Sequence, residues 1–176
     1  MSLEMQTGYN GKPDEYAVYR WKREDHLFLW RYTEAPQQGW QLSADATACA
    51  SIVDLVDRML AADGPTHKRI PVSVPARMRV FPGLEWEPAS ALMLRYPKGQ
   101  TEDEHWHAER ANGAELVLTV GAAKLHQLRD AMLEMPNWKD DFALGPEIDE
   151  MRNRRRNHGE RPGSVSQCIW FWTTVS

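Results

Sequence analysis

Two histidines and a glutamate occupy alternate positions in the middle of this chain. They are His105, His107 and Glu109. Side chains at alternate positions of an extended strand project from the same face, and two imidazoles with a carboxylate are suitable ligands for zinc, iron or manganese. The spacing predicts a divalent metal site or a catalytic acid and base pair. The favoured alternative is that these residues form a solvated strand face whose charge changes with pH.

The residues before this cluster add a resemblance to a known family. Gly99 is followed by five residues and then by His105-Trp106-His107, a spacing similar to the start of the first metal-binding motif of the cupins. The resemblance implies a metal-ligand role for His105 and His107 alone. It does not extend to Glu109, because the cupin glutamate follows the second histidine by several residues and Glu109 follows it by two.

A basic segment, Arg152–Arg161, is the second candidate site. Its clustered cations are Arg152, Arg154, Arg155 and Arg156. Guanidinium groups on an exposed helix grip phosphates, which makes nucleic-acid contact one hypothesis. The same arginines complement the negative end of a helix and can pair with the acidic residues at 147–150. A solvated face or a partner-protein contact is therefore favoured over nucleic acid.

Composition narrows the classes of function. The formal net charge of −4 gives no general attraction for nucleic acid or an anionic membrane. Tryptophan is in excess, and its large ring with one polar N–H suits sheet faces and interfaces. The tryptophans are Trp21, Trp30, Trp40, Trp86, Trp106, Trp138, Trp170 and Trp172. This excess, with no complete catalytic motif in the sequence, favours a non-catalytic binding or protein-interaction domain. Its partner is an unknown protein or a second copy of the chain.

The two cysteines and the lengths of the apolar runs indicate where in the cell the protein is expected to lie. Cys49 and Cys168 do not make a disulfide framework or a metal-ligand spacing, and both are expected to be buried. No apolar run approaches the roughly 20 residues of a membrane span. Residues 1–12 are expected to be a flexible N-terminal segment. We therefore expect a cytoplasmic protein with no membrane contact and no cofactor other than a divalent metal.

Apolar residues at three- and four-residue steps predict two amphipathic helices. The first spans 45–62 and carries the stripe Ile52, Leu55, Val56, Met59 and Leu60. The second spans 122–135, with the stripe Leu125, Leu128, Met132 and Met135, and Pro136 stops it. A third, largely exposed helix is expected to begin at Pro146.

The remaining patterns predict strands. Residues 16–23 and 26–33 read as a hairpin, and 105–110 and 115–120 as a second hairpin about Asn112-Gly113. Residues 40–42 and 91–96 read as further strands, and the apolar segment 167–175 is expected inside a sheet. Four prolines between 71 and 88 confine the expected strands 70–74 and 78–81 to edges.

The element order predicts a single α+β domain over residues 1–176, a mainly antiparallel twisted sheet with both amphipathic helices on one face. A duplicated β-β-α unit is a further hypothesis. Arg31-Tyr32, Trp40 and residues 57–60 of the first half resemble Arg95-Tyr96, Trp106 and residues 130–133 of the second. Chance similarity remains an alternative, because the spacings differ between the two halves.

Overall fold

The structure, a computed structural model, describes residues 16–32, 39–73, 85–112, 114–137, 142–146 and 167–173. The helices are α1 (Ala17–Arg20), α2 (Ala46–Ala61), α3 (Ala122–Glu134) and a 3-10 turn, η1 (Met135–Asn137). The strands are β1 (Leu27–Tyr32), β2 (Trp40–Ala44), β3 (Thr66–Pro71), β4 (Trp86–Pro88), β5 (Ala91–Tyr96), β6 (Trp106–Ala111), β7 (Glu115–Val120), β8 (Phe142–Leu144) and β9 (Ile169–Thr173).

The strands form two sheets rather than one. The first has the order β4-β1-β2-β9-β8 and the second the order β3-β5-β7-β6. Neighbouring strands are antiparallel except in the pairs β2 with β9 and β5 with β7. The predicted α+β class and the mainly antiparallel pairing are confirmed. The prediction of a single sheet is corrected, because the chain crosses from one sheet to the other after each long helix.

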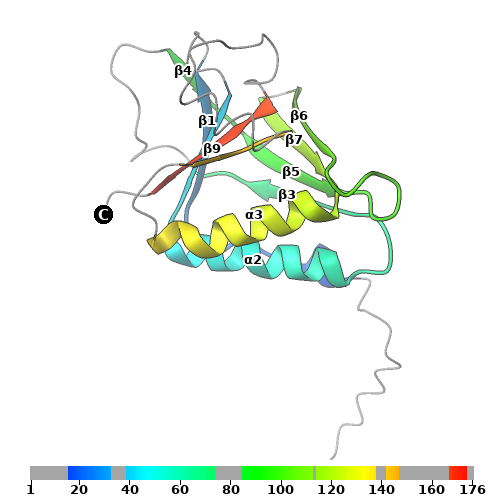
Figure 1. The fold of residues 1–176 in the computed structure, drawn as a ribbon. Coiled ribbons are helices and arrows are strands. Elements are labelled where there is room, and N and C mark those ends of the chain that lie inside the picture. Colours follow the sequence, from blue (N-terminus) through cyan, green and yellow to red (C-terminus); the bar gives the residue numbers. More distant parts are fainter. Residues whose placement is uncertain are drawn as a thin grey trace, which may run out of the picture.

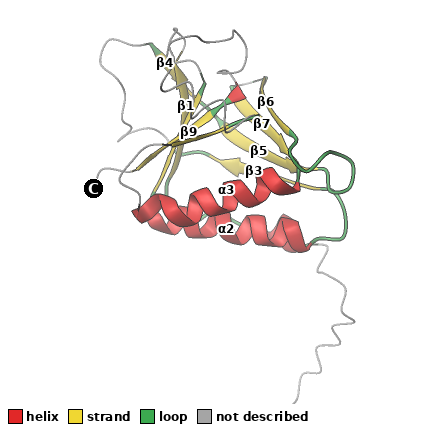
Figure 2. Ribbon diagram, in the orientation of Figure 1, coloured by secondary structure: helices red, strands yellow, loops and turns green. Residues whose placement is uncertain are grey.

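Helices α2 and α3 lie side by side, run in opposite directions, and cover one side of both sheets (Figure 1; Figure 2). The predicted stripe of α2 is buried at Ile52, Leu55, Val56 and Met59, and that of α3 is buried at Leu125, Leu128 and Met132. The carboxylate of Asp45 accepts a hydrogen bond from the backbone N–H of Ala48, so it caps the start of α2. Among the described helices, none combines the length and apolar character needed to cross a membrane.

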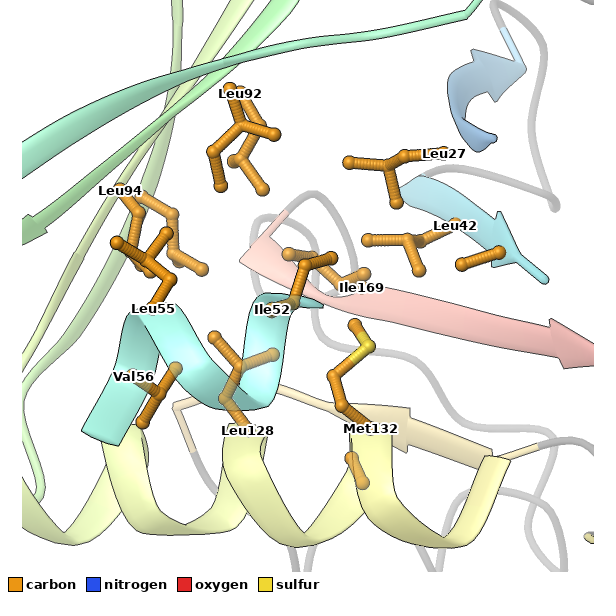
Figure 3. Close-up of a cluster of buried hydrophobic side chains, with 14 of the residues drawn as sticks. Leu27, Leu42, Ile52, Leu55, Val56, Leu92, Leu94, Leu128, Met132 and Ile169 are labelled. Atoms are coloured by element: carbon orange, nitrogen blue, oxygen red, sulfur yellow. The ribbon is translucent and has the colours of Figure 1, made fainter. Parts of the chain in front are cut away.

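The core fills the space enclosed by the two sheets and the two long helices. Figure 3 shows Leu92 and Leu94 of β5 on one side, Leu27 and Leu42 of the first sheet on the other, and side chains of α2 and α3 beneath them. Leu27, Leu94, Leu55 and Val56 are fully buried. Full burial of one such side chain contributes about 1.5–3 kcal/mol to stability, so this shared core fixes the relative positions of the two sheets and the two long helices.

The predicted hairpin of 16–23 with 26–33 is wrong. Residues 17–20 form the short helix α1, and β1 pairs instead with β2 and β4. The aromatic and aliphatic composition of 16–23 suits a strand, but tertiary packing decides the outcome. Val18 and Trp21 are three residues apart, so one helical turn buries both in the core cluster that also contains α2.

Several shorter elements differ from expectation. Strand β9 lies inside its sheet, as predicted, with β2 and β8 as neighbours. The strand expected at 70–74 begins earlier, at Thr66, and the short strands β4 and β8 were not predicted. The expected strand 78–81, the helix expected after Pro146 and residues 1–12 lie outside the described residues.

The two halves of the chain repeat one topology. Each half runs through a hairpin, a long helix and a pair of strands in the other sheet: β1, β2, α2, then β3 and β5; β6, β7, α3, then β8 and β9. The second hairpin strand of each half pairs in parallel with the last strand of the other half. Apart from the edge strand β4, each sheet is therefore built from the hairpin of one half and the final strands of the other, and the two halves are interlocked.

The residue pairs whose similarity in the sequence suggested this repeat do not occupy equivalent positions in the two halves. Counted from the N-cap residues Asp45 and Gly121, Ile52 of α2 corresponds to Leu128 of α3, and Met59 to Met135 rather than Met132. In the hairpins, Arg31 lies opposite the first residue of β2, and Arg110 lies opposite Leu116 at the same end of β7. Arg31 therefore corresponds to Arg110, not to Arg95.

Candidate functional site

The residues of the predicted metal site lie at β6. His107 and Glu109 point outward, opposite Thr119 and Val117, and each side chain is 52% exposed. Nε2 of His107 lies 3.5 Å from the carboxylate of Glu109. His105 precedes the strand, where its carbonyl accepts a hydrogen bond of 2.8 Å from the N–H of Gly121.

The structure brings His107 and Glu109 together without gathering a ligand set. Among the described residues, no group of three or more His, Cys, Asp or Glu side chains is placed to hold a metal ion. In the described residues, the small all-β barrel of the cupins is also not observed, because two long helices pack on two separate sheets. Metal binding by His105, His107 and Glu109 stays a prediction. The arginines at 152 and 154–156 lie outside the described residues.

The tryptophans serve mainly in sheet and core packing. Trp21, Trp40 and Trp106 belong to the main core. Trp30 is fully buried in a second cluster on the other face of β1, with Phe28, Tyr32 and Trp172. Trp86, on the edge strand β4, is 36% exposed. Most of the tryptophan excess in the described residues is therefore explained by folding, and a binding surface must be sought elsewhere.

Both cysteines are buried, as predicted, with exposed fractions of 1% for Cys49 and 2% for Cys168. Burial, aided by the negative charge of Asp45, raises the pKa of the Cys49 thiol from 9.0 to about 12. The folded protein therefore holds this proton more tightly than the unfolded chain does. The stability that this thiol contributes is complete below pH 9 and is lost as the pH rises toward 12.

We expect neither thiol to react with a small disulfide reagent in the native protein at pH 8, because the thiolate is the reactive form and both sulfur atoms are covered. Two equivalents should react in denaturant. Absorbance of the released thiol measures both reactions. Rapid modification of Cys49 in the folded protein would contradict the burial described here.

The most exposed aromatic residues lie on α1 rather than on a sheet. Tyr16 is 61% exposed and Tyr19 is 80% exposed. The opposite side of this short helix is fixed, because the Trp21 indole N–H donates a 2.6 Å hydrogen bond to the carbonyl of Ser51 in α2. A guanidinium N–H of Arg58, also on α2, donates to the carbonyl of Ala17 at 2.8 Å. The tyrosines are therefore displayed on a rigid support.

A cationic side chain lies beside each of these tyrosine rings. The guanidinium of Arg20 lies 5.7 Å from the centre of the Tyr16 ring, and Nζ of Lys68 lies 5.4 Å from that of Tyr19. The ammonium of Lys68 also donates a hydrogen bond to the carbonyl of Tyr19. We call this surface the α1 corner and define it by Tyr16, Tyr19, Arg20, Lys22 and Lys68.

Positive charge is crowded at the α1 corner. The pKa of Lys68 is lowered from its ordinary value, first by partial desolvation and then by the charges of Lys22 and Arg58. A lowered lysine pKa means that the charged form is disfavoured in the folded protein. The chain as a whole is acidic, with a net charge of −4. The α1 corner is thus a basic and aromatic surface on an acidic protein.

Sequence reasoning missed this surface because it assigned 16–23 to a strand. Read at helical spacing, the same residues separate well. Val18 and Trp21 fall on one side, whereas Tyr16, Tyr19 and Arg20 fall on the other. The signal was the absence of any acidic residue from Tyr16 to Arg23, a run that contains three cations.

A second polar cluster joins the two halves of the chain. Nε–H of Arg31 donates to Oε1 of Glu87, and a second guanidinium, that of Arg110, lies 3.3 Å from the same oxygen. The Arg31 guanidinium also lies 5.8 Å from the centre of the buried Trp40 ring. The three charged side chains are partly exposed, at 32% for Arg31, 44% for Arg110 and 29% for Glu87.

Two sheet edges are protected against pairing with another strand. The edge strand β3 carries Lys68, Arg69 and Pro71, residue types that discourage strand addition. At the edge strand β6, the side-chain amide of Gln167 forms hydrogen bonds with both backbone groups of Ala108. It accepts from the N–H at 2.7 Å and donates to the carbonyl at 2.8 Å. At these edges, a partner must be recognised by side chains.

No family model, no curated protein and no solved structure matches this chain.

Proposed function

We propose that this protein is a non-catalytic protein-interaction domain, and that the α1 corner binds an acidic surface of a partner protein. One observation carries the proposal. Two largely exposed tyrosines stand on a firmly held helix, with the cations Arg20, Lys22 and Lys68 around them.

The residue types at the α1 corner match those that dominate protein interfaces. Tyrosine and arginine are enriched among the residues whose truncation costs most binding energy. Tyr19 is 80% exposed, so its ring contributes little burial to the folded chain. Buried against a partner, such a ring gains the hydrophobic free energy that it lacks in the isolated protein. Tyr16 and Tyr19 are therefore expected to contribute more to the binding of a partner than to the stability of the free protein.

The charges at the α1 corner define the chemistry of the partner. Partial desolvation and the charges of Lys22 and Arg58 lower the pKa of Lys68, and a carboxylate of an acidic partner beside Lys68 would favour its charged form. Complementary charge also speeds association and selects against basic partners. Nucleic acid is the competing polyanion, but the net charge of −4 would repel it outside this small surface.

Site-specific cross-linking in the cells that naturally make this protein tests the proposal. A photoreactive benzoylphenylalanine replaces Tyr19 in one version and Leu133 in a matched control. Leu133 is also exposed, at 48%, but lies on α3. We expect position 19 to capture an acidic protein that position 133 does not capture.

Binding measurements with the captured protein then check the surface. Replacing Tyr19 and Arg20 together by serine should weaken binding about tenfold to a hundredfold, because each truncated interface residue of this kind costs about 1 kcal/mol or more. Leu133→Ser should leave the affinity unchanged. The proposal fails if position 19 captures nothing distinct from position 133. It also fails if a single-stranded oligonucleotide binds as tightly as the captured protein and competes with it.

A further inference from the structure

The repeated topology brings one equivalent residue from each half of the chain to a common point. Leu27, Leu29 and Arg31 follow one another along one side of β1, and Trp106, Ala108 and Arg110 do so along one side of β6. In both series the first two residues are buried in the core and the third is an arginine. Both arginines therefore project from the inner side of their hairpins, at the end where the core stops.

The two arginines form a double guanidinium that holds a single oxygen. Arg31 and Arg110 both contact Oε1 of Glu87, so two positive charges face one carboxylate. Arg31 is further oriented by the buried ring of Trp40. Guanidinium forks bind carboxylate and phosphate oxygens with defined geometry. The two arginines and Glu87 together carry one net positive charge. This charge favours an anion that binds beside Glu87 or takes its place.

The carboxylate in this cluster comes from a short edge strand. Glu87 is the middle residue of the three-residue strand β4, which ends in Pro88 and, among the described strands, pairs only with β1. Strand β4 is inserted between β3 and β5 of the first half and lies outside the topology that the two halves share. The arginines thus belong to the repeated framework, whereas Glu87 does not.

We propose that Arg31 and Arg110 form an oxyanion-binding site for a carboxylate or phosphate group, and that Glu87 is a built-in competitor that occupies it. The site is distinct from the α1 corner and does not depend on the function proposed for that surface. An external oxyanion binds when the Glu87 side chain leaves the two arginines. Its affinity in the unaltered protein is reduced by this competition.

Calorimetric titration with glutarate and, separately, with inorganic phosphate tests this inference. Glu87→Gln keeps the side-chain shape and removes the competing charge. We expect it to bind at least one of the two oxyanions about tenfold more tightly than the unaltered protein does. Glu109→Gln is the matched control, because it removes the same charge from the outer face of β6. Its affinity for both oxyanions should equal that of the unaltered protein. Tighter binding of glutarate identifies a carboxylate ligand, and tighter binding of phosphate a phosphoryl ligand.

A double variant distinguishes the site from a general charge effect. Adding Arg110→Gln to Glu87→Gln should remove the gain in affinity. The inference is overturned if Glu87→Gln binds neither oxyanion more tightly than Glu109→Gln does, or if the gain survives in the double variant. Thermal unfolding without ligand checks that each variant is folded. If Glu87→Gln is unfolded, Glu87→Asp, which shortens the competing arm, should show a smaller gain, and no gain would count against the inference.

Discussion

Trp21→Ala is expected to lower the free energy of unfolding by about 3–5 kcal/mol, the usual cost of truncating a buried tryptophan. Trp21 is 3% exposed, and its N–H bonds to the carbonyl of Ser51 in α2. The substitution leaves a cavity beneath α1 and removes the hydrogen bond that ties Trp21 to α2. Because total stability is about 5–15 kcal/mol for most domains, the loss should be visible in a denaturant titration.

Hydrogen exchange in the Trp21→Ala variant tests whether Trp21 also holds α1 in place. Hydrogen exchange of the amides from Ala17 to Lys22 should speed up more than exchange in β7, since Trp21 anchors α1 to the core. Trp86→Ala is the control, because Trp86 is 36% exposed on an edge strand and should cost less than about 1 kcal/mol. Equal losses in the two variants would show that Trp21 is not the anchor described here.

Gly121→Ala is expected to cost about 3 kcal/mol. A methyl group at this N-cap position would lie 2.0 Å from the carbonyl oxygen of Glu102 and 2.6 Å from that of Asp103. Both are backbone atoms, so the segment before β6 must move. That movement would also break the cap of α3, because the Asp103 carbonyl accepts from the N–H groups of Ala123 and Lys124 at 2.9 and 3.3 Å.

Gly64→Ala supplies the comparison for this prediction. Among the described residues, no atom lies within 4 Å of the position that its new methyl group would take. Its stability should be unchanged or raised by up to about 1 kcal/mol, because alanine restricts the unfolded chain. Thermal unfolding of both variants measures the difference. A Gly121→Ala protein as stable as Gly64→Ala would show that the segment at 102–104 does not pack on α3 as described.

The parts of the fold that the sequence predicted are those with long periodic patterns. Helices α2 and α3 each repeat apolar residues over several turns, and most of β6 alternates between buried and exposed positions. Short segments gave no such signal. Helix α1 has a single turn, and β4 and β8 have three residues each, so tertiary packing alone determines their form.

The candidate sites were harder to predict because they join distant segments. The contact of Arg31 with Glu87 and Arg110 unites three strands, and no local motif records it. A signal for the repeat was nevertheless present. Glu24-Asp25-His26 precedes β1 and Asp103-Glu104-His105 precedes β6, and in each case an arginine follows the histidine by five residues. His105 therefore has an equivalent in His26, which favours a structural role in the hairpin for this histidine.

The most direct test of the central claim measures affinity and stability together in Lys22→Gln. If positive charge is crowded at the α1 corner for binding, this variant should bind the protein captured at Tyr19 several-fold more weakly. Its free energy of unfolding should stay the same or rise by up to about 0.5 kcal/mol. Arg95→Gln, which removes an exposed charge on β5, should leave the affinity unchanged. An unchanged affinity in Lys22→Gln, or an equal loss in Arg95→Gln, would contradict the account.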